Sequence, residues 1–98
     1  MSITVVTRWK GNQEEGLRIA RQVAPLLKNQ GATSVRFGYC HAGAYTGHLS
    51  LATIYPDGAT YGKATQALSE DPQAQRILAE ALKIAELQDR SVIITQDL

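Results

Sequence analysis

Residues 34–55 read SVRFGYCHAGAYTGHLSLATIY, and this stretch decides the fold. Its two ends alternate between apolar and polar residues, which predicts strands over Ser34–His41 and His48–Tyr55. The glycine-rich segment Ala42–Gly47 between them is short enough to be a hairpin connection. The chain is therefore expected to fold around a central β-hairpin.

One strand and one helix are expected on each side of this hairpin, from alternation and from helical spacing of apolar residues. Pro25 removes one helical hydrogen bond and is expected to kink the first helix. The expected bounds are a strand at Ile3–Lys10, a helix from Gln13 to a stop at Gly31, a helix in two pieces at Thr60–Leu68 and from Asp71 onward, and a strand at Ser91–Gln96.

The order strand, helix, strand, strand, helix, strand predicts two βαβ units fused through the hairpin. This is the α+β, ferredoxin-like arrangement, a four-stranded antiparallel sheet with both helices on one face. The 98 residues are enough for one domain, so residues 1–98 are expected to form a single one.

Composition narrows the range of partners and locations. The chain is 44% hydrophobic and 19% charged, and no apolar run approaches the ~20 residues that span a bilayer. A formal charge of +1 gives no electrostatic argument for nucleic acid or an anionic membrane as a partner. The lone Cys40 cannot form a disulfide within the chain, and the first residues lack the pattern of a secretory signal. A cytoplasmic protein is expected.

Apolar residues occupy both faces of the expected sheet. Val6, Ile54 and Ile93 alternate with the apolar residues that should face the helices. A four-stranded face covers roughly 300 Å², near the largest apolar patch that a monomer usually exposes. With no third helix to cover it, the face is expected to pack on a second copy of the chain as a homodimer. A monomer whose own side chains shield the face is the alternative.

Four stretches carry a resemblance to a known family, namely Ile3–Trp9, Gly31–Ala32, Ile54–Gly58 with Tyr61–Gly62, and Ala67–Gln75. The whole chain resembles the dimeric α+β barrel superfamily. The last stretch is similar to the split second helix of antibiotic-monooxygenase-like and NIPSNAP-like domains. The resemblance implies two ferredoxin-like sheets paired into a barrel with the helices outside. It leaves the activity open, because the superfamily includes cofactorless monooxygenases, haem degraders, isomerases and small-molecule sensors.

His41 and His48 flank the hairpin loop and could lie near one another across it. One interpretation is a metal pair or a general base, helped by Cys40 or Tyr45. The other, which we favour, is two histidines that contact solvent or cap backbone groups at the mouth of the hairpin. Because two imidazoles without a nearby carboxylate are an incomplete site, no metal is expected. The haem-degrading relatives ligate haem through a helical histidine, and neither histidine lies in an expected helix. No cofactor is expected.

The space between sheet and helices is where the resembling families hold a substrate. Polar or amphipathic side chains expected to line it, and to bind a small aromatic or acidic ligand, are Arg8, Trp9, Arg36, Tyr39, Tyr55 and Tyr61.

The leading hypothesis is a homodimeric protein that binds a small organic molecule between sheet and helices. One alternative is a cofactor-independent monooxygenase or isomerase acting on a small aromatic substrate, with Tyr39, His41 or Arg8 as the catalytic group. Another is a structural dimer module with a filled core and no ligand.

Overall fold

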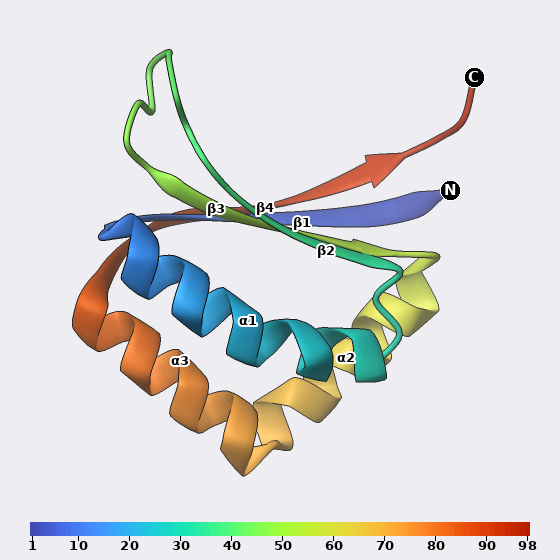
Figure 1. The fold of residues 1–98 in the computed structure, drawn as a ribbon. Coiled ribbons are helices and arrows are strands. Elements are labelled where there is room, and N and C mark those ends of the chain that lie inside the picture. The colour runs from blue at the N-terminus through green and yellow to red at the C-terminus, as the bar shows by residue number, and fades with distance from the viewer.

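The computed structural model describes residues 1–98 as one sheet with a layer of helices on one of its faces (Figure 1). In chain order the elements are β1 (Ser2–Gly11), α1 (Gln13–Asn29), β2 (Ser34–Tyr39), β3 (Leu49–Tyr55), α2 (Gly58–Glu70), α3 (Pro72–Ile84) and β4 (Ala85–Thr95). The strand order is β2-β3-β1-β4, and every neighbouring pair is antiparallel. The ferredoxin-like prediction is confirmed.

Helix α1 begins and ends where its sequence favours a boundary. Asn12 caps it by accepting a hydrogen bond from the Glu15 backbone N–H at 3.0 Å. The helix continues through Pro25. Gly31 follows with φ of +105°, a conformation that favours glycine, and an added Cβ there would lie 2.5 Å from the Thr60 Cγ2. The turn after α1 therefore packs closely against α2.

Asp71 separates α2 from α3, which confirms the expected two-piece helix. Its backbone N–H bonds to the Leu68 carbonyl at the end of α2, and its carboxylate accepts the Gln73 backbone N–H at 2.9 Å. Pro72 occupies the first turn of α3, where its missing N–H costs nothing. One aspartate thus ends one helix and begins the next, and the two helices meet at an elbow (Figure 1).

Strand β4 is much longer than expected, because it begins at Ala85 rather than Ser91. The polar stretch from Glu86 to Arg90 has no strand pattern of its own, and it pairs along β1 as an edge strand. A β-bulge between Arg8 and Trp9 shifts the register, so that Leu87 pairs with Trp9. Pairing with β1 therefore overrides the local preference of this segment.

The helix-facing side of the sheet carries the core in two separate clusters. One lies where β1 and β3 meet the start of β2 and α2, and consists of Ile3, Val5, Ala32, Tyr55 and Ala64. The other lies mainly between α1 and α3, and consists of Ile19, Ile77 and Ala81, with Trp9 packed against it.

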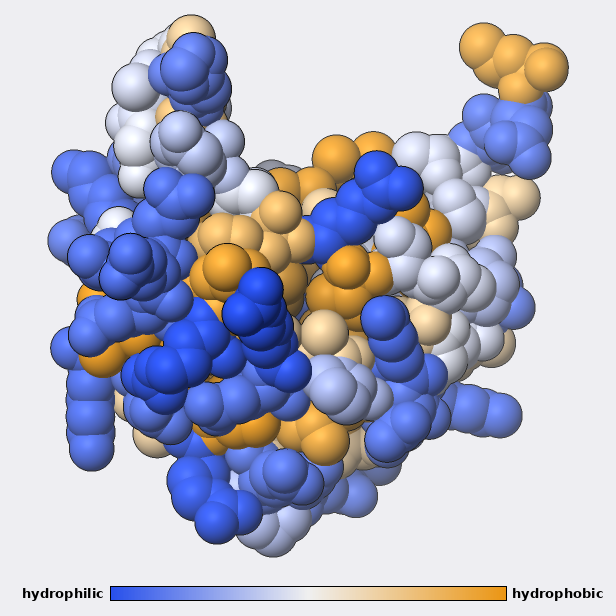
Figure 2. All heavy atoms as spheres, viewed as in Figure 1, coloured by the Kyte–Doolittle hydropathy of each residue, from blue (hydrophilic) through white to orange (hydrophobic).

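The outer face of the sheet, which no helix covers, is apolar only at its centre. Val6 and Ala52 are cross-strand partners there, and Ile54 and Ile93 lie on either side of Thr4. Arg8, Asp89, Arg36 and several serines and threonines share the same face by register. The apolar residues of this face are thus gathered at its centre and bordered by charged and hydroxyl side chains. Figure 2 shows the β2–β3 loop and the C-terminal residues rising at opposite ends of a saddle above the sheet. None of the helices is long and apolar enough to cross a membrane.

Candidate functional site

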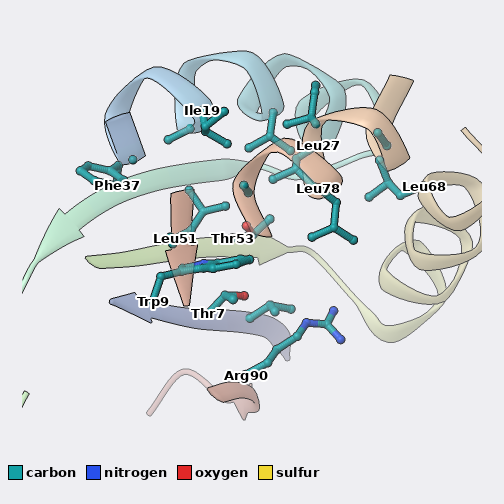
Figure 3. Close-up of a pocket in the computed structure, with 18 of the residues that line it drawn as sticks. Thr7, Trp9, Ile19, Leu27, Phe37, Leu51, Thr53, Leu68, Leu78 and Arg90 are labelled. Carbon is teal, nitrogen blue, oxygen red and sulfur yellow. The ribbon is translucent and has the colours of Figure 1, made fainter. Parts of the chain in front are cut away.

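A cavity of about 370 Å³ lies between the sheet and the helices (Figure 3). Alternation along β1 points Val5, Thr7 and Trp9 toward the helices, and the apolar stripe of α1 faces them with Ile19 and Val23. Most lining side chains are hydrophobic. The space is of the size that small-molecule sites usually have, and its wall has the composition typical of them.

Small residues at close approaches keep this space open. Ala20 and Ala81 are buried and line it from α1 and α3. Gly16 brings the first turn of α1 against the sheet, because a Cβ there would lie 2.5 Å from the Leu49 side chain. Larger side chains at these positions would fill the cavity or push α1 away from the sheet.

The mouth of the cavity lies between the elbow of the helices and β4. The lining residues that are solvent-exposed mark it, and they are Thr65, Ser69, Gln75, Leu78 and Arg90. The Gln75 side-chain amide donates a hydrogen bond to the Leu68 carbonyl at 3.1 Å, which ties α3 to the end of α2 beside this mouth. The elbow therefore forms one lip of the cavity and the edge strand the other.

Tyr55 and Arg90 are the two titratable side chains that line the cavity. Burial raises the pKa of the Tyr55 hydroxyl, and the positive charge of Arg90 opposes that rise. At neutral pH the Tyr55 hydroxyl stays protonated, so it can donate a hydrogen bond but cannot serve as a base.

Of the six side chains expected to bind a ligand, Trp9 and Tyr55 line the cavity. Tyr61 packs edge-on against Tyr55, with ring centroids 5.7 Å apart, and does not line the space. The remaining three differ from expectation. Arg36 and Arg8 belong to the outer face by register, and Tyr39 is exposed near the end of β2 beyond the cavity.

Arg90 is a lining residue that the sequence analysis missed. The expected fourth strand began at Ser91, so Arg90 fell outside it. In β4, Arg90 pairs with Thr7 and shares its face with Val92 and Ile94. That alternation was visible in the sequence and could have identified Arg90, had the strand been extended by one residue.

Arg8 belongs to a different cluster, on the outer face under the β2–β3 loop. Its guanidinium forms a bidentate pair with Asp89 and lies 3.5 Å from the ring centroid of Tyr45. The hydrogen bond from Arg8 holds the pKa of Asp89 below its ordinary value. These contacts fold Tyr45 of the loop onto the sheet.

The two histidines lie at the two ends of the same loop and differ in burial. His41 is exposed, whereas the Nδ1 atom of His48 is buried and lacks a hydrogen-bond partner. The His48 ring lies against Tyr45, with centroids 5.7 Å apart. No group of three potential ligands among histidine, cysteine, aspartate and glutamate comes together anywhere in the chain.

The cavity wall holds no carboxylate, imidazole or thiol. It therefore offers no side chain of the kinds that most often act as general bases near neutral pH. What it can do is exclude water from an apolar molecule, donate hydrogen bonds from hydroxyls, and stabilise negative charge at Arg90.

No family model matches the sequence, and no curated protein matches it either. Solved structures do match. SnoaB, a cofactor-independent oxygenase from Streptomyces nogalater, superposes with a TM-score of 0.71 at 13% identity, over 99% of this chain and 95% of its own. An uncharacterised NIPSNAP domain protein from Burkholderia xenovorans gives 0.76 at 16% identity, over 98% and 95%. The chain therefore shares the ferredoxin-like fold of these structures.

A third structure with this fold is a putative antibiotic biosynthesis monooxygenase from Chloroflexus aurantiacus, which superposes with a TM-score of 0.69 at 8% identity. It covers 99% of this chain and 95% of that one. The ferredoxin-like fold is thus matched over nearly the whole chain by an oxygenase, a NIPSNAP domain protein and a putative monooxygenase. At sequence identities this low, the similarity establishes a shared fold only.

Proposed function

We propose that this protein binds a small, mainly apolar organic molecule in the cavity between sheet and helices, and that it works as a homodimer joined through the outer face. The cavity carries the first part of the proposal. A closed core of close-packed side chains would leave few voids larger than a water molecule, whereas this space is about 370 Å³. That difference argues against a purely structural dimer module.

The shape of the cavity supports a ligand of about two fused rings. Trp9 offers a flat aromatic surface on the sheet side, and Leu78 lies on the helix side of the cavity (Figure 3). Ile77 also lines the cavity from α3. The few polar groups in the wall, such as Thr7 and Thr53, are enough to orient a ligand without making the site water-filled.

A second candidate function is that of a cofactor-independent monooxygenase or isomerase. It is favoured by the likeness to SnoaB, which is described as a cofactor-independent oxygenase, and by the Arg90 guanidinium at the mouth of the cavity. Because the wall lacks a base, a substrate of this enzyme would have to ionise readily by itself, and Arg90 would stabilise its anion. Binding without turnover separates the first function from this one.

The homodimer is supported by the saddle on the outer face. Its apolar centre alone is too small, because a stable interface buries about 800 Å² on each partner. The β2–β3 loop and the end of β4 stand at the two ends of the saddle and would extend the contact. Ile93 is 47% exposed in the single chain, so a partner copy would bury it.

The binding function is tested by filling the cavity. We expect the variant Ala20→Leu to lose binding of naphthalene-1-carboxamide, because the larger side chain occupies the ligand's space. At about −0.3 kcal/mol per non-hydrogen atom, a probe of this size should bind the unaltered protein with a Kd of about 1 mM. Trp9 is the only tryptophan, so its indole N–H signal in a proton–nitrogen NMR spectrum reports binding directly.

Ala59→Leu is the matched control, since Ala59 is exposed on α2 and does not line the cavity. It should bind the probe as the unaltered protein does. Saturable shifts of equal affinity in Ala20→Leu, or no shift of Trp9 in the unaltered protein at millimolar probe, would contradict the proposed binding function.

A further inference from the structure

Arg90 is the only charged side chain that lines the cavity. It takes part in neither of the two salt bridges of the chain, which join Arg8 to Asp89 and Arg18 to Glu80. Figure 3 shows its side chain extending from β4 along the edge of the cavity. The mouth therefore carries one positive charge that no carboxylate of the chain neutralises in a salt bridge.

The sheet fixes this charge on the cavity side. Arg90 pairs with Thr7, and both face the helices, as do Val92 and Ile94 farther along β4. The next residue toward the bulge, Asp89, faces the opposite side of the sheet and pairs with Arg8 there. The only acidic neighbour in sequence is thus directed away from Arg90.

The rest of the wall suits an apolar body beside that charge. Trp9 lies two residues from Thr7 on the same face of β1, a separation of about 7 Å along the strand. An aromatic surface and a guanidinium are therefore held within the length of one small molecule. Arginine presents a planar fork of donors that matches a carboxylate in two parallel hydrogen bonds.

We infer that the cavity selects organic anions, in which a flat apolar body lies against Trp9 and a carboxylate meets the Arg90 guanidinium at the mouth. This inference rests on the proposed binding function and specifies its ligand class. A neutral molecule of the same shape would fill the same space but leave the guanidinium without an anionic partner.

The test compares two probes of nearly equal shape, naphthalene-1-carboxylate and naphthalene-1-carboxamide, by titration of the Trp9 indole signal. The unaltered protein should bind the carboxylate about tenfold more tightly, a difference typical of one charge-assisted interaction that is open to solvent. In Arg90→Gln the preference should disappear while the carboxamide affinity stays the same, which shows that the variant is folded. Arg90→Lys keeps the charge and should restore part of the preference.

Arg76→Gln is the matched control, because Arg76 is an exposed arginine of α3 that does not line the cavity. It should keep the full preference. Raising the salt from about 0.05 M to about 0.5 M should weaken the preference in the unaltered protein, since the Arg90 charge is exposed and salt screens it.

Three results would overturn the inference. Equal affinity for the two probes in the unaltered protein, or a preference that survives in Arg90→Gln, would refute selection by Arg90 and leave the binding function standing. No binding of either probe at millimolar concentration would refute both the inference and the proposed function.

Discussion

Two arginines near the middle of the β1–β4 pair, Arg8 and Arg90, lie on opposite faces of the sheet. Arg90 pairs with Thr7 and faces the cavity without a salt-bridge partner. Arg8 pairs with Asp89 and faces the outer side, where Asp89 and Tyr45 hold its guanidinium. The same residue type thus supplies an unpaired charge at the mouth of the cavity and a salt-bridged one on the outer face, and strand parity decides which face each arginine occupies.

The Arg8–Asp89 pair predicts a pH dependence. The folded-state pKa of Asp89 lies below its ordinary value, so the pair stabilises the fold above the unfolded pKa of about 3.9 and loses that effect as the pH falls through the folded value. We expect Asp89→Asn to lower the melting temperature slightly near pH 7. The difference from the unaltered protein should shrink as the pH falls below about 4.

Asp97→Asn is the control for that experiment, because Asp97 is an exposed aspartate that forms no salt bridge. Its melting temperature should follow the unaltered protein at every pH. A deficit of Asp89→Asn that stayed constant from neutral to strongly acidic pH would mean that the ion pair is not its cause.

The sheet face of a site residue could be predicted from the sequence wherever the bounds of its strand were correctly predicted. Trp9 shares its strand face with Val5 and Thr7, and Tyr55 shares its face with Thr53, so both could be placed on the helix side from β1 and β3. Arg8 and Arg36 were grouped with them by chemistry rather than by parity. Their strands were correctly identified, and the alternation alone would have assigned them to the outer face.

At the scale of elements, local signals predicted the helices well and the last strand poorly. Asp71 followed by Pro72 starts a helix through interactions with neighbouring residues only, and α3 begins there in the structure. The start of β4 depends instead on pairing with β1 across more than 70 residues of sequence. The alternation of Arg90, Val92 and Ile94 could have extended the strand by one residue, but the stretch from Glu86 to Asp89 has no strand pattern that indicates this pairing.

Gly11 allows the beginning of β4, at Ala85, to lie directly against the end of β1. A Cβ on Gly11 would come within 2.9 Å of the Ala85 Cβ, so the end of β1 and the beginning of β4 approach as closely as two backbones with small side chains allow. This approach carries the chain directly from α3 into the sheet. It also places Ala85, the first residue of β4, on the cavity wall.

At the scale of the whole molecule, the proposed dimer predicts the effect of a charge on the outer face. Ile93→Asp should convert the dimer, of twice 10.7 kDa, into a monomer, because a buried carboxylate without a partner costs several kcal/mol. Ile93 is half-exposed in the single chain, so the melting temperature of the monomer itself should change little. Sedimentation equilibrium measures the mass.

Leu82→Asp is the matched control, since Leu82 is also exposed and apolar but lies on α3. It should remain dimeric. If the unaltered protein sediments as a single chain, or if both variants dissociate alike, the outer face is not the contact between copies.

The binding of a molecule inside the fold is the central claim, and intermolecular nuclear Overhauser effects test it most directly. With naphthalene-1-carboxylate bound, we expect contacts from its ring protons to the methyl groups of Val5, Ile19 and Ile77, which line the cavity. Contacts instead to Val6, Ile54 and Ile93 would place the molecule on the outer face of the sheet and contradict the claim.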